Sequence, residues 1–83
     1  MRRRVEWTPQ AHADVRRINR QTALGLLRSL ADYLLSGHGD VERLTDVRPP
    51  ELRLRLGNWR IRFRDHGDWM EILRVLDRKD AYR

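Results

Sequence analysis

Apolar and polar residues alternate strictly in two runs of the chain, Leu-Arg-Leu-Arg-Leu at 52–56 and Trp-Arg-Ile-Arg-Phe at 59–63. The two residues between these runs, Gly57-Asn58, are typical of the tight turn of a β-hairpin. A two-residue turn fixes the register, so Leu56 is predicted to face Trp59, and Leu52 to face Phe63. One face of this hairpin is then wholly apolar, and the other carries four arginines: Arg53, Arg55, Arg60 and Arg62.

The predicted register places like charges opposite one another, which destabilises a sheet. Each arginine of the first strand faces an arginine of the second, and Glu51 is the only acidic residue in the stretch 48–64. We therefore expect a polyanion or an acidic partner to complete this face.

Apolar residues at helical spacing predict two helices before the hairpin. Thr8-Pro9 is typical of an N-cap followed by proline at the first helical position. A short amphipathic helix that starts there places Ala11, Val15 and Ile18 on one face. Its polar neighbours are then left for solvent: Asp14, Arg16, Arg17 and Arg20.

The second helix is predicted from about Asn19 to Ser36. Gly37 follows it and suits the left-handed conformation beyond a helix end. The apolar stripe on this helix is too wide for an exposed position, so we expect it to cover a sheet or another helix. The stripe consists of Ala23, Leu24, Leu27, Leu30, Ala31, Leu34 and Leu35.

Extended segments are predicted on both sides of these elements. Residues 5–7 form a short strand, whereas 40–50 form an irregular connection. After a turn at 65–68, the run 69–76 has apolar residues on both faces, as in a central strand. Residues 1–83 then form one α+β domain, in which two N-terminal helices pack on one face of a mostly antiparallel sheet in the order β-α-α-β-β-β. The first strand is expected to pair with a later one, and the other face of the sheet stays open.

Composition narrows the function. The chain has 83 residues and a formal net charge of +6, which suits a nucleic-acid partner. Seventeen of its 18 basic residues are arginines, which reflects either the forked contacts of arginine with phosphate or the coding composition of the source genome. The absence of cysteine excludes disulfides and thiolate metal sites and permits an intracellular setting. No cofactor is expected, and no segment is apolar enough to span a membrane.

Three motifs, in this order, resemble those of the RelE/ParE toxin superfamily of type II toxin–antitoxin systems. They are Trp-Thr-Pro at 7–9, the arginine hairpin, and Arg-Lys-Asp-Ala-Tyr at 78–82. The resemblance implies a cytoplasmic toxin with a cognate antitoxin as partner, and contact with operator DNA only through that antitoxin. In the RelE branch, it further implies entry into the ribosome and cleavage of mRNA by attack of a ribose 2′-hydroxyl on its 3′-phosphate.

The resemblance also implies which residues carry the reaction: Arg53, Arg55, Arg60, Arg78 and Tyr82. Arg60 and Arg78 would hold the phosphate, where preorganised cations stabilise the charge of the transition state. Tyr82 would stack on a base or assist proton transfer.

The proton acceptor of this reaction is not evident in the sequence. Arg53 and Arg55 stay protonated where some relatives have lysine, so neither serves as a general base. A carboxylate of Glu51 or Asp77 either accepts the proton or weakens the site. Two other functions therefore stay open: a ParE-like poison of DNA gyrase on the same fold, and a non-catalytic nucleic-acid-binding module.

Overall fold

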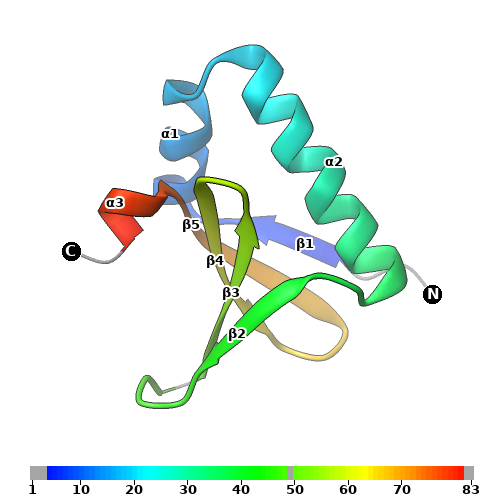
Figure 1. Cartoon of the computed structure of the whole chain (residues 1–83). Helices are drawn as coiled ribbons and strands as arrows, with labels where there is room; N and C mark the ends of the chain where they lie inside the picture. The colour runs from blue at the N-terminus through cyan, green and yellow to red at the C-terminus, as the bar shows by residue number, and fades with distance from the viewer. Residues whose placement is uncertain (1–3, 49, 82–83) are drawn as a thin grey trace.

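A computed structural model describes residues 4–48 and 50–81 of the chain. Its elements, in chain order, are β1 (Arg4–Trp7), α1 (Pro9–Arg17), α2 (Arg20–Ser36), β2 (Asp40–Leu44), β3 (Glu51–Leu56), β4 (Trp59–Asp65), β5 (Trp69–Asp77) and α3 (Arg78–Ala81) (Figure 1). Within these residues, no helix has both the length and the apolar character needed to cross a membrane.

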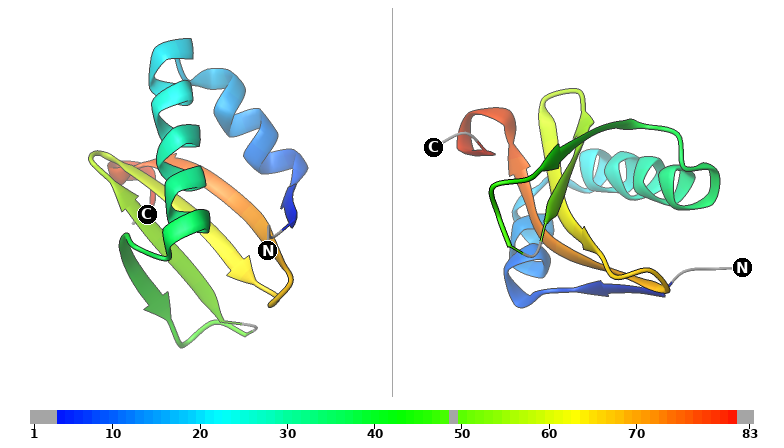
Figure 2. Two further views of the ribbon diagram at one scale, coloured as in Figure 1. Left: turned by 90° about the vertical axis from the view of Figure 1, so that its right-hand side faces the viewer. Right: turned by 90° about the horizontal axis from the view of Figure 1, so that it is seen from below.

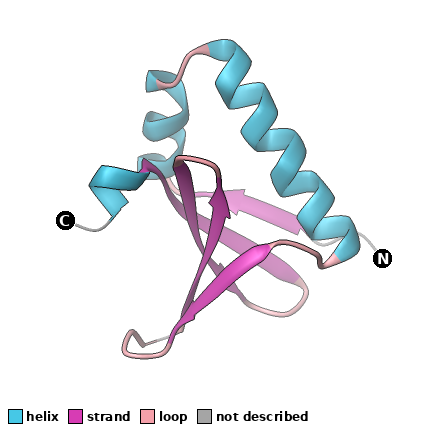
Figure 3. Cartoon of the chain, in the orientation of Figure 1, coloured by secondary structure: helices cyan, strands magenta, loops and turns pink. Residues whose placement is uncertain are grey.

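The strands form one sheet in the order β1-β5-β4-β3-β2 (Figure 3). β1 runs parallel to β5, and the other neighbouring pairs are antiparallel. α1 lies over β1 and β5, whereas α2 lies over β3 and β4 (Figure 2). Both helices contribute to one apolar core with the strands. The α+β class, the helices on one face and the pairing of the first strand with a later one are therefore confirmed.

The hairpin of β3 and β4 has the register predicted from its turn. Leu56 pairs with Trp59, Leu54 with Ile61, and Leu52 with Phe63. Gly57 has a φ of +61°, which the tight hairpin turn requires and which glycine adopts without strain. The apolar side of the hairpin is buried: Leu54, Ile61 and Phe63 are all at most 1% exposed.

Thr8 joins β1 and α1 to β5. Its hydroxyl accepts a hydrogen bond from Ala11 N–H at 3.1 Å, as an N-cap does, and donates to the carbonyl of Leu73 at 2.9 Å. Its own N–H donates to the carbonyl of Ile72 at 3.1 Å. The chain therefore leaves the sheet at Thr8, and α1 runs beside the part of β5 that β1 does not cover.

The prediction that the whole apolar stripe of α2 covers a sheet or another helix is wrong. Leu26 and Leu30 are the buried residues of this helix, and the Tyr33 ring meets the Phe63 ring edge-on at 5.7 Å. Leu24, Leu27 and Leu35 are instead exposed. The apolar stripe is wide because it combines a core-facing row with a row that the described residues leave uncovered.

The expected irregular connection at 40–50 begins with a strand. β2 pairs antiparallel with β3 and forms the edge of the sheet, with Val41 opposite Leu54 and Glu42 opposite Arg53. Only Val41 and Leu44 of this strand are apolar, so its alternation is too weak to recognise in isolation. The sheet is one strand wider than the sequence indicated.

A β-bulge explains why β5 appeared apolar on both faces. Phe63 pairs with Ile72 and Arg62 with Arg74, so Leu73 is an extra residue in the ladder. The bulge shifts the alternation by one position, and Met70, Ile72 and Val75 all reach the core. β5 is an interior strand, with β1 on one side and β4 on the other.

Candidate functional site

The face of the sheet away from the helices carries arginines from three neighbouring strands. They alternate with the core residues of β3 and β4, and the bulge brings one arginine of β5 into line with them. We call this surface the arginine face; its members are Arg53, Arg55, Arg60, Arg62, Arg64 and Arg74.

Carboxylates from other strands neutralise much of the arginine face. Glu42 Oε2 on β2 lies 3.5 Å from Arg53 Nη1 and 3.2 Å from Arg55 Nη2. Glu51, the only acidic residue of the stretch 48–64, is therefore joined by a carboxylate from β2, a strand that the sequence did not reveal. The repulsion between facing arginines is offset within the sheet, without a bound polyanion.

Glu51 has a structural role. It is 3% exposed, and its two oxygens accept hydrogen bonds from Arg62 Nε at 2.9 Å and Arg62 Nη2 at 3.0 Å. Arg64 Nη2 lies 3.6 Å from the same carboxylate. Both oxygens of the Glu51 carboxylate are therefore engaged by guanidinium groups within the sheet.

Arg60 is more buried than an outward-facing strand residue should be. It is 7% exposed, and its Nη1 donates to the carbonyls of Gly57 at 2.7 Å and Trp59 at 2.9 Å. The side chain therefore holds the hairpin turn together. This role could not be predicted from the sequence, because the acceptors are backbone groups of the turn.

The tail returns to the hairpin turn at Arg78. Its N–H donates to the Asn58 carbonyl at 2.6 Å, and its side chain is exposed at the start of α3. Asp77 Oδ1 accepts from Lys79 N–H at 3.1 Å and so caps this short helix. Arg78 thus lies beside the arginine hairpin. Tyr82, the last of the expected site residues, lies outside the described residues.

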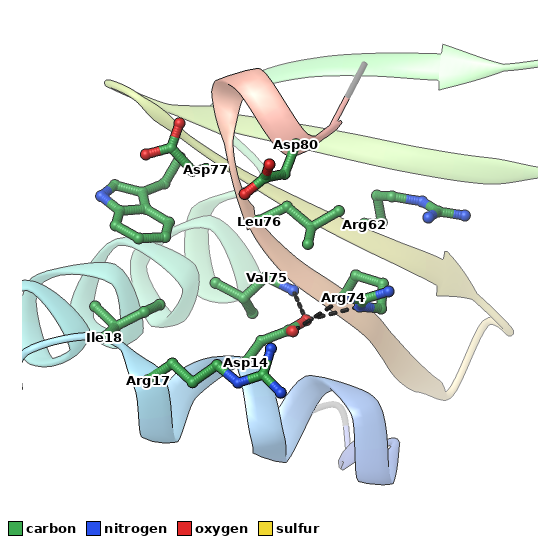
Figure 4. A pocket seen from close by; sticks show the side chains of 10 residues that line it. Asp14, Arg17, Ile18, Arg62, Arg74, Val75, Leu76, Asp77 and Asp80 are labelled. Carbon is green, nitrogen blue, oxygen red and sulfur yellow. Dashed lines mark hydrogen bonds and ion pairs between the residues drawn. The ribbon is translucent and has the colours of Figure 1, made fainter. Parts of the chain in front are cut away.

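A pocket of about 540 Å³ lies next to this end of the sheet, between α1, β5 and α3 (Figure 4). The charged residues that line it are three arginines and three aspartates: Arg17, Arg62, Arg74, Asp14, Asp77 and Asp80. Asp14 was predicted to face solvent but is 7% exposed. Its oxygens accept hydrogen bonds from Arg74 Nε at 2.8 Å, Arg74 Nη2 at 3.0 Å and Val75 N–H at 2.9 Å.

The Asp14–Arg74 pair stays ionised. Burial by itself would raise the pKa of Asp14, but the hydrogen bonds from Arg74 and Val75, with the charges of Arg74 and Arg17, outweigh it and hold that pKa below its usual range. The hydrogen bond to Asp14 in turn raises the pKa of Arg74. Sequence reasoning missed this pair because 60 residues separate its members.

Solved toxin–antitoxin complexes contain chains with the same fold. The RelB–RelE antitoxin–toxin complex from Methanococcus jannaschii gives a TM-score of 0.73 at 20% identity, over 92% of this chain and 93% of that chain. The archaeal RelE–RelB complex from Pyrococcus horikoshii OT3 gives a TM-score of 0.73 at 20% identity, over 94% of this chain and 97% of that chain. The toxin–antitoxin complex RelBE2 from Mycobacterium tuberculosis gives a TM-score of 0.72 at 20% identity, over 94% of this chain and 100% of that chain. The fold is therefore RelE-like.

The sequence itself identifies the family. The family described as ParE toxin of type II toxin-antitoxin system, parDE, matches residues 5–82. The chain belongs to this family, within the RelE/ParE superfamily that its motifs resemble, and is a toxin of a type II toxin–antitoxin system. No curated protein matches the sequence.

Proposed function

We propose that this toxin is a ribosome-dependent mRNA endonuclease of the RelE type. The observation that carries the proposal is the hydrogen bond from Arg78 N–H to the Asn58 carbonyl, which docks the tail on the hairpin turn. It brings the exposed side chain of Arg78 to the end of the sheet where Arg55 and Arg60 pair. A phosphate at this end meets cations from β3, β4 and α3 on a rigid support.

The proposed reaction is attack of a ribose 2′-hydroxyl on its own 3′-phosphate. The 2′-oxygen loses its proton and bonds to phosphorus to give a 2′,3′-cyclic phosphate, while the bond between phosphorus and the 5′-oxygen of the next nucleotide breaks and that oxygen takes up a proton to leave as a 5′-hydroxyl. Arg55 and Arg78 stabilise the charge on the phosphate oxygens. Because Glu51 is held by Arg62 and Asp77 caps α3, we propose that ribosomal RNA supplies the proton acceptor.

Translating ribosomes with a defined mRNA test this proposal. Purified toxin, free of antitoxin, is expected to cut the mRNA within the codon in the A site and to leave 5′-hydroxyl ends, which primer extension maps to the nucleotide. The same mRNA without ribosomes is expected to stay intact. Growth arrest in cells whose mRNA remains uncut would contradict the proposal.

The ion pairs on the arginine face favour a second candidate, a ParE-like poison of DNA gyrase. Glu42 and Glu51 each lie within ion-pair distance of two members of the arginine face and so reduce its net charge. A protein target needs less unpaired charge than a nucleic acid does. DNA breakage and induction of the SOS response on expression, with translation unaffected, would support gyrase and exclude the ribosome.

We further propose that the cognate antitoxin covers the outer face of α2. Leu24, Leu27 and Leu35, the large hydrophobic residues exposed in the described part of the chain, all lie on this helix. Arg20 and Arg28 also lie on α2, and neither has an ion-pair partner within residues 4–48 and 50–81. An amphipathic antitoxin segment with acidic residues fits this combination of leucine and arginine.

Replacing Leu24 and Leu35 together with glutamine is expected to weaken antitoxin binding by about tenfold or more, because anchor residues carry most of the energy of an interface. Isothermal titration with the antitoxin encoded beside the toxin measures the effect. The melting temperature should stay unchanged, since neither leucine is buried. Thr45→Ala, a change at an exposed residue directly after β2 and outside α2, is the control. Unaltered affinity of the double variant would place the antitoxin elsewhere.

A further inference from the structure

Glu42 bridges Arg55, which the proposed function uses, and its neighbour Arg53. It lies on the edge strand β2, directly opposite Arg53 and diagonal to Arg55. A single oxygen, Oε2, lies within ion-pair distance of both guanidinium groups, at 3.5 Å and 3.2 Å. The arrangement draws the two cations toward one point on the arginine face.

Among the ion pairs of the arginine face, the Glu42 bridge is more exposed than the pairs made by Glu51 and Asp14, although its Arg53 side chain is only 11% exposed. The Glu42 side chain is 44% exposed and that of Arg55 is 42% exposed. The carboxylates of Glu51 and Asp14 are only 4% and 7% exposed and are part of the packed structure. An exposed ion pair contributes little to stability, because water solvates both partners in the unfolded chain. The bridge at Glu42 is therefore not explained by folding alone.

We propose that Glu42 is a positioning residue of the phosphate site. It aligns Arg53 and Arg55 in the free toxin, and its carboxylate occupies the place at Arg55 where a phosphate oxygen binds. RNA must displace this carboxylate, so Glu42 lowers the affinity of the arginine face for nucleic acid while keeping its cations in place. The inference rests on the proposed function, because it takes a phosphate as the ligand of these arginines.

The variant Glu42→Gln tests the proposal. Glutamine has the same length and retains an oxygen that accepts a hydrogen bond from arginine, but it carries no charge. The probe is a single-stranded RNA oligonucleotide with 2′-O-methyl groups, which cannot be cut. We expect its affinity to rise by roughly threefold to tenfold at low salt, because a negative charge next to the bound phosphate is removed. The slope of log affinity against log salt should steepen by about 0.7 for one added phosphate contact.

Two further variants separate positioning from general charge effects. Glu6→Gln removes a carboxylate from β1, the opposite edge strand, where Glu6 pairs with Arg4 at 3.5 Å. This variant removes one negative charge, as Glu42→Gln does, but at the other edge of the sheet. Its affinity for the oligonucleotide should therefore stay close to that of the wild type. In an Arg55→Gln background, Glu42→Gln should bring no gain, because the cation that it frees is missing.

The outcomes distinguish this inference from the proposed function. If the wild type binds the oligonucleotide and Glu42→Gln binds it with the same affinity and salt slope, the role of Glu42 is contradicted and the proposed function stands. An equal gain for Glu6→Gln would likewise overturn it, since bulk charge would then explain the effect. If neither the wild type nor Glu42→Gln binds at low salt, the arginine face does not hold phosphate by itself and the role of Glu42 is overturned, whereas the proposed function is then decided by cleavage on the ribosome.

Discussion

Replacing Asp14 with asparagine is expected to lower the free energy of unfolding by about 2 kcal/mol at neutral pH, the range for hydrogen bonds to a charged group. Asp14 accepts hydrogen bonds from both Arg74 and the Val75 N–H, and it is buried. Asparagine offers one acceptor oxygen in place of two, so one of these donors loses its partner. Urea unfolding followed by circular dichroism measures the change.

The effect of this substitution should depend on pH. A carboxyl whose pKa is lower in the folded protein than in the unfolded chain, where it is about 3.9, stabilises the fold fully above that value. The contribution is lost as the pH falls through the lower, folded pKa of Asp14. The difference between wild type and Asp14→Asn should therefore be constant from about pH 5 to 7 and shrink below about pH 4.

Asp32→Asn is the matched control, because Asp32 is an exposed aspartate on α2. It should change the free energy of unfolding by no more than about 0.5 kcal/mol, as surface substitutions do. Equal stability of Asp14→Asn and wild type at pH 7 would show that the buried ion pair contributes nothing. A difference that persists unchanged at pH 3 would assign the effect to packing and not to the charge.

Features fixed by neighbouring residues could be predicted from the sequence. The Gly57-Asn58 turn set every pair of the hairpin, since a two-residue loop allows a single register. Thr8 and Gly37 marked the start of α1 and the end of α2, because cap residues act within one helical turn. Arg78 lies beside the hairpin turn because the antiparallel pairing of β4 with β5 brings the end of β5 to that turn.

Features that depend on distant partners could not be predicted. Asp14 looked like a surface residue of an amphipathic helix, because its partners on β5 lie 60 and 61 residues away. β2 has too few apolar residues to be recognised, and it is held by pairing with β3. Without β2, Glu42 had no visible relation to Arg53 and Arg55, so the arginine face seemed far less balanced than it is.

The arginines of the expected site also differ in ways that strand alternation does not show. Arg55 and Arg60 are paired neighbours on one face, yet Arg55 is exposed and Arg60 is buried against the turn carbonyls. Alternation assigns a face to a residue, but the length and flexibility of arginine decide where its charge lies. Of the site residues that the structure describes, Arg55 and Arg78 are exposed, Arg53 is largely buried, and Arg60 also supports the hairpin.

That division makes Arg78→Ala the sharpest test of the proposed function. Cleavage of mRNA on the ribosome is expected to fall by about a hundredfold or more, the usual loss when one group that stabilises a developing charge is removed. The melting temperature should not change, because the Arg78 side chain is exposed and its backbone N–H still binds the Asn58 carbonyl. Single-turnover cleavage and thermal unfolding of the same preparation measure both.

Two further variants show whether a loss of activity in Arg78→Ala comes from general positive charge or from a change in structure. Lys79→Ala removes an exposed cation from the neighbouring position of α3 and should keep most of the activity. Arg60→Ala should lose both activity and about 1 to 2 kcal/mol of stability, because the carbonyls of Gly57 and Trp59 lose a buried donor. Full activity of Arg78→Ala would remove the tail from the site. Equal losses in Arg78→Ala and Lys79→Ala would mean that α3 contributes only general positive charge.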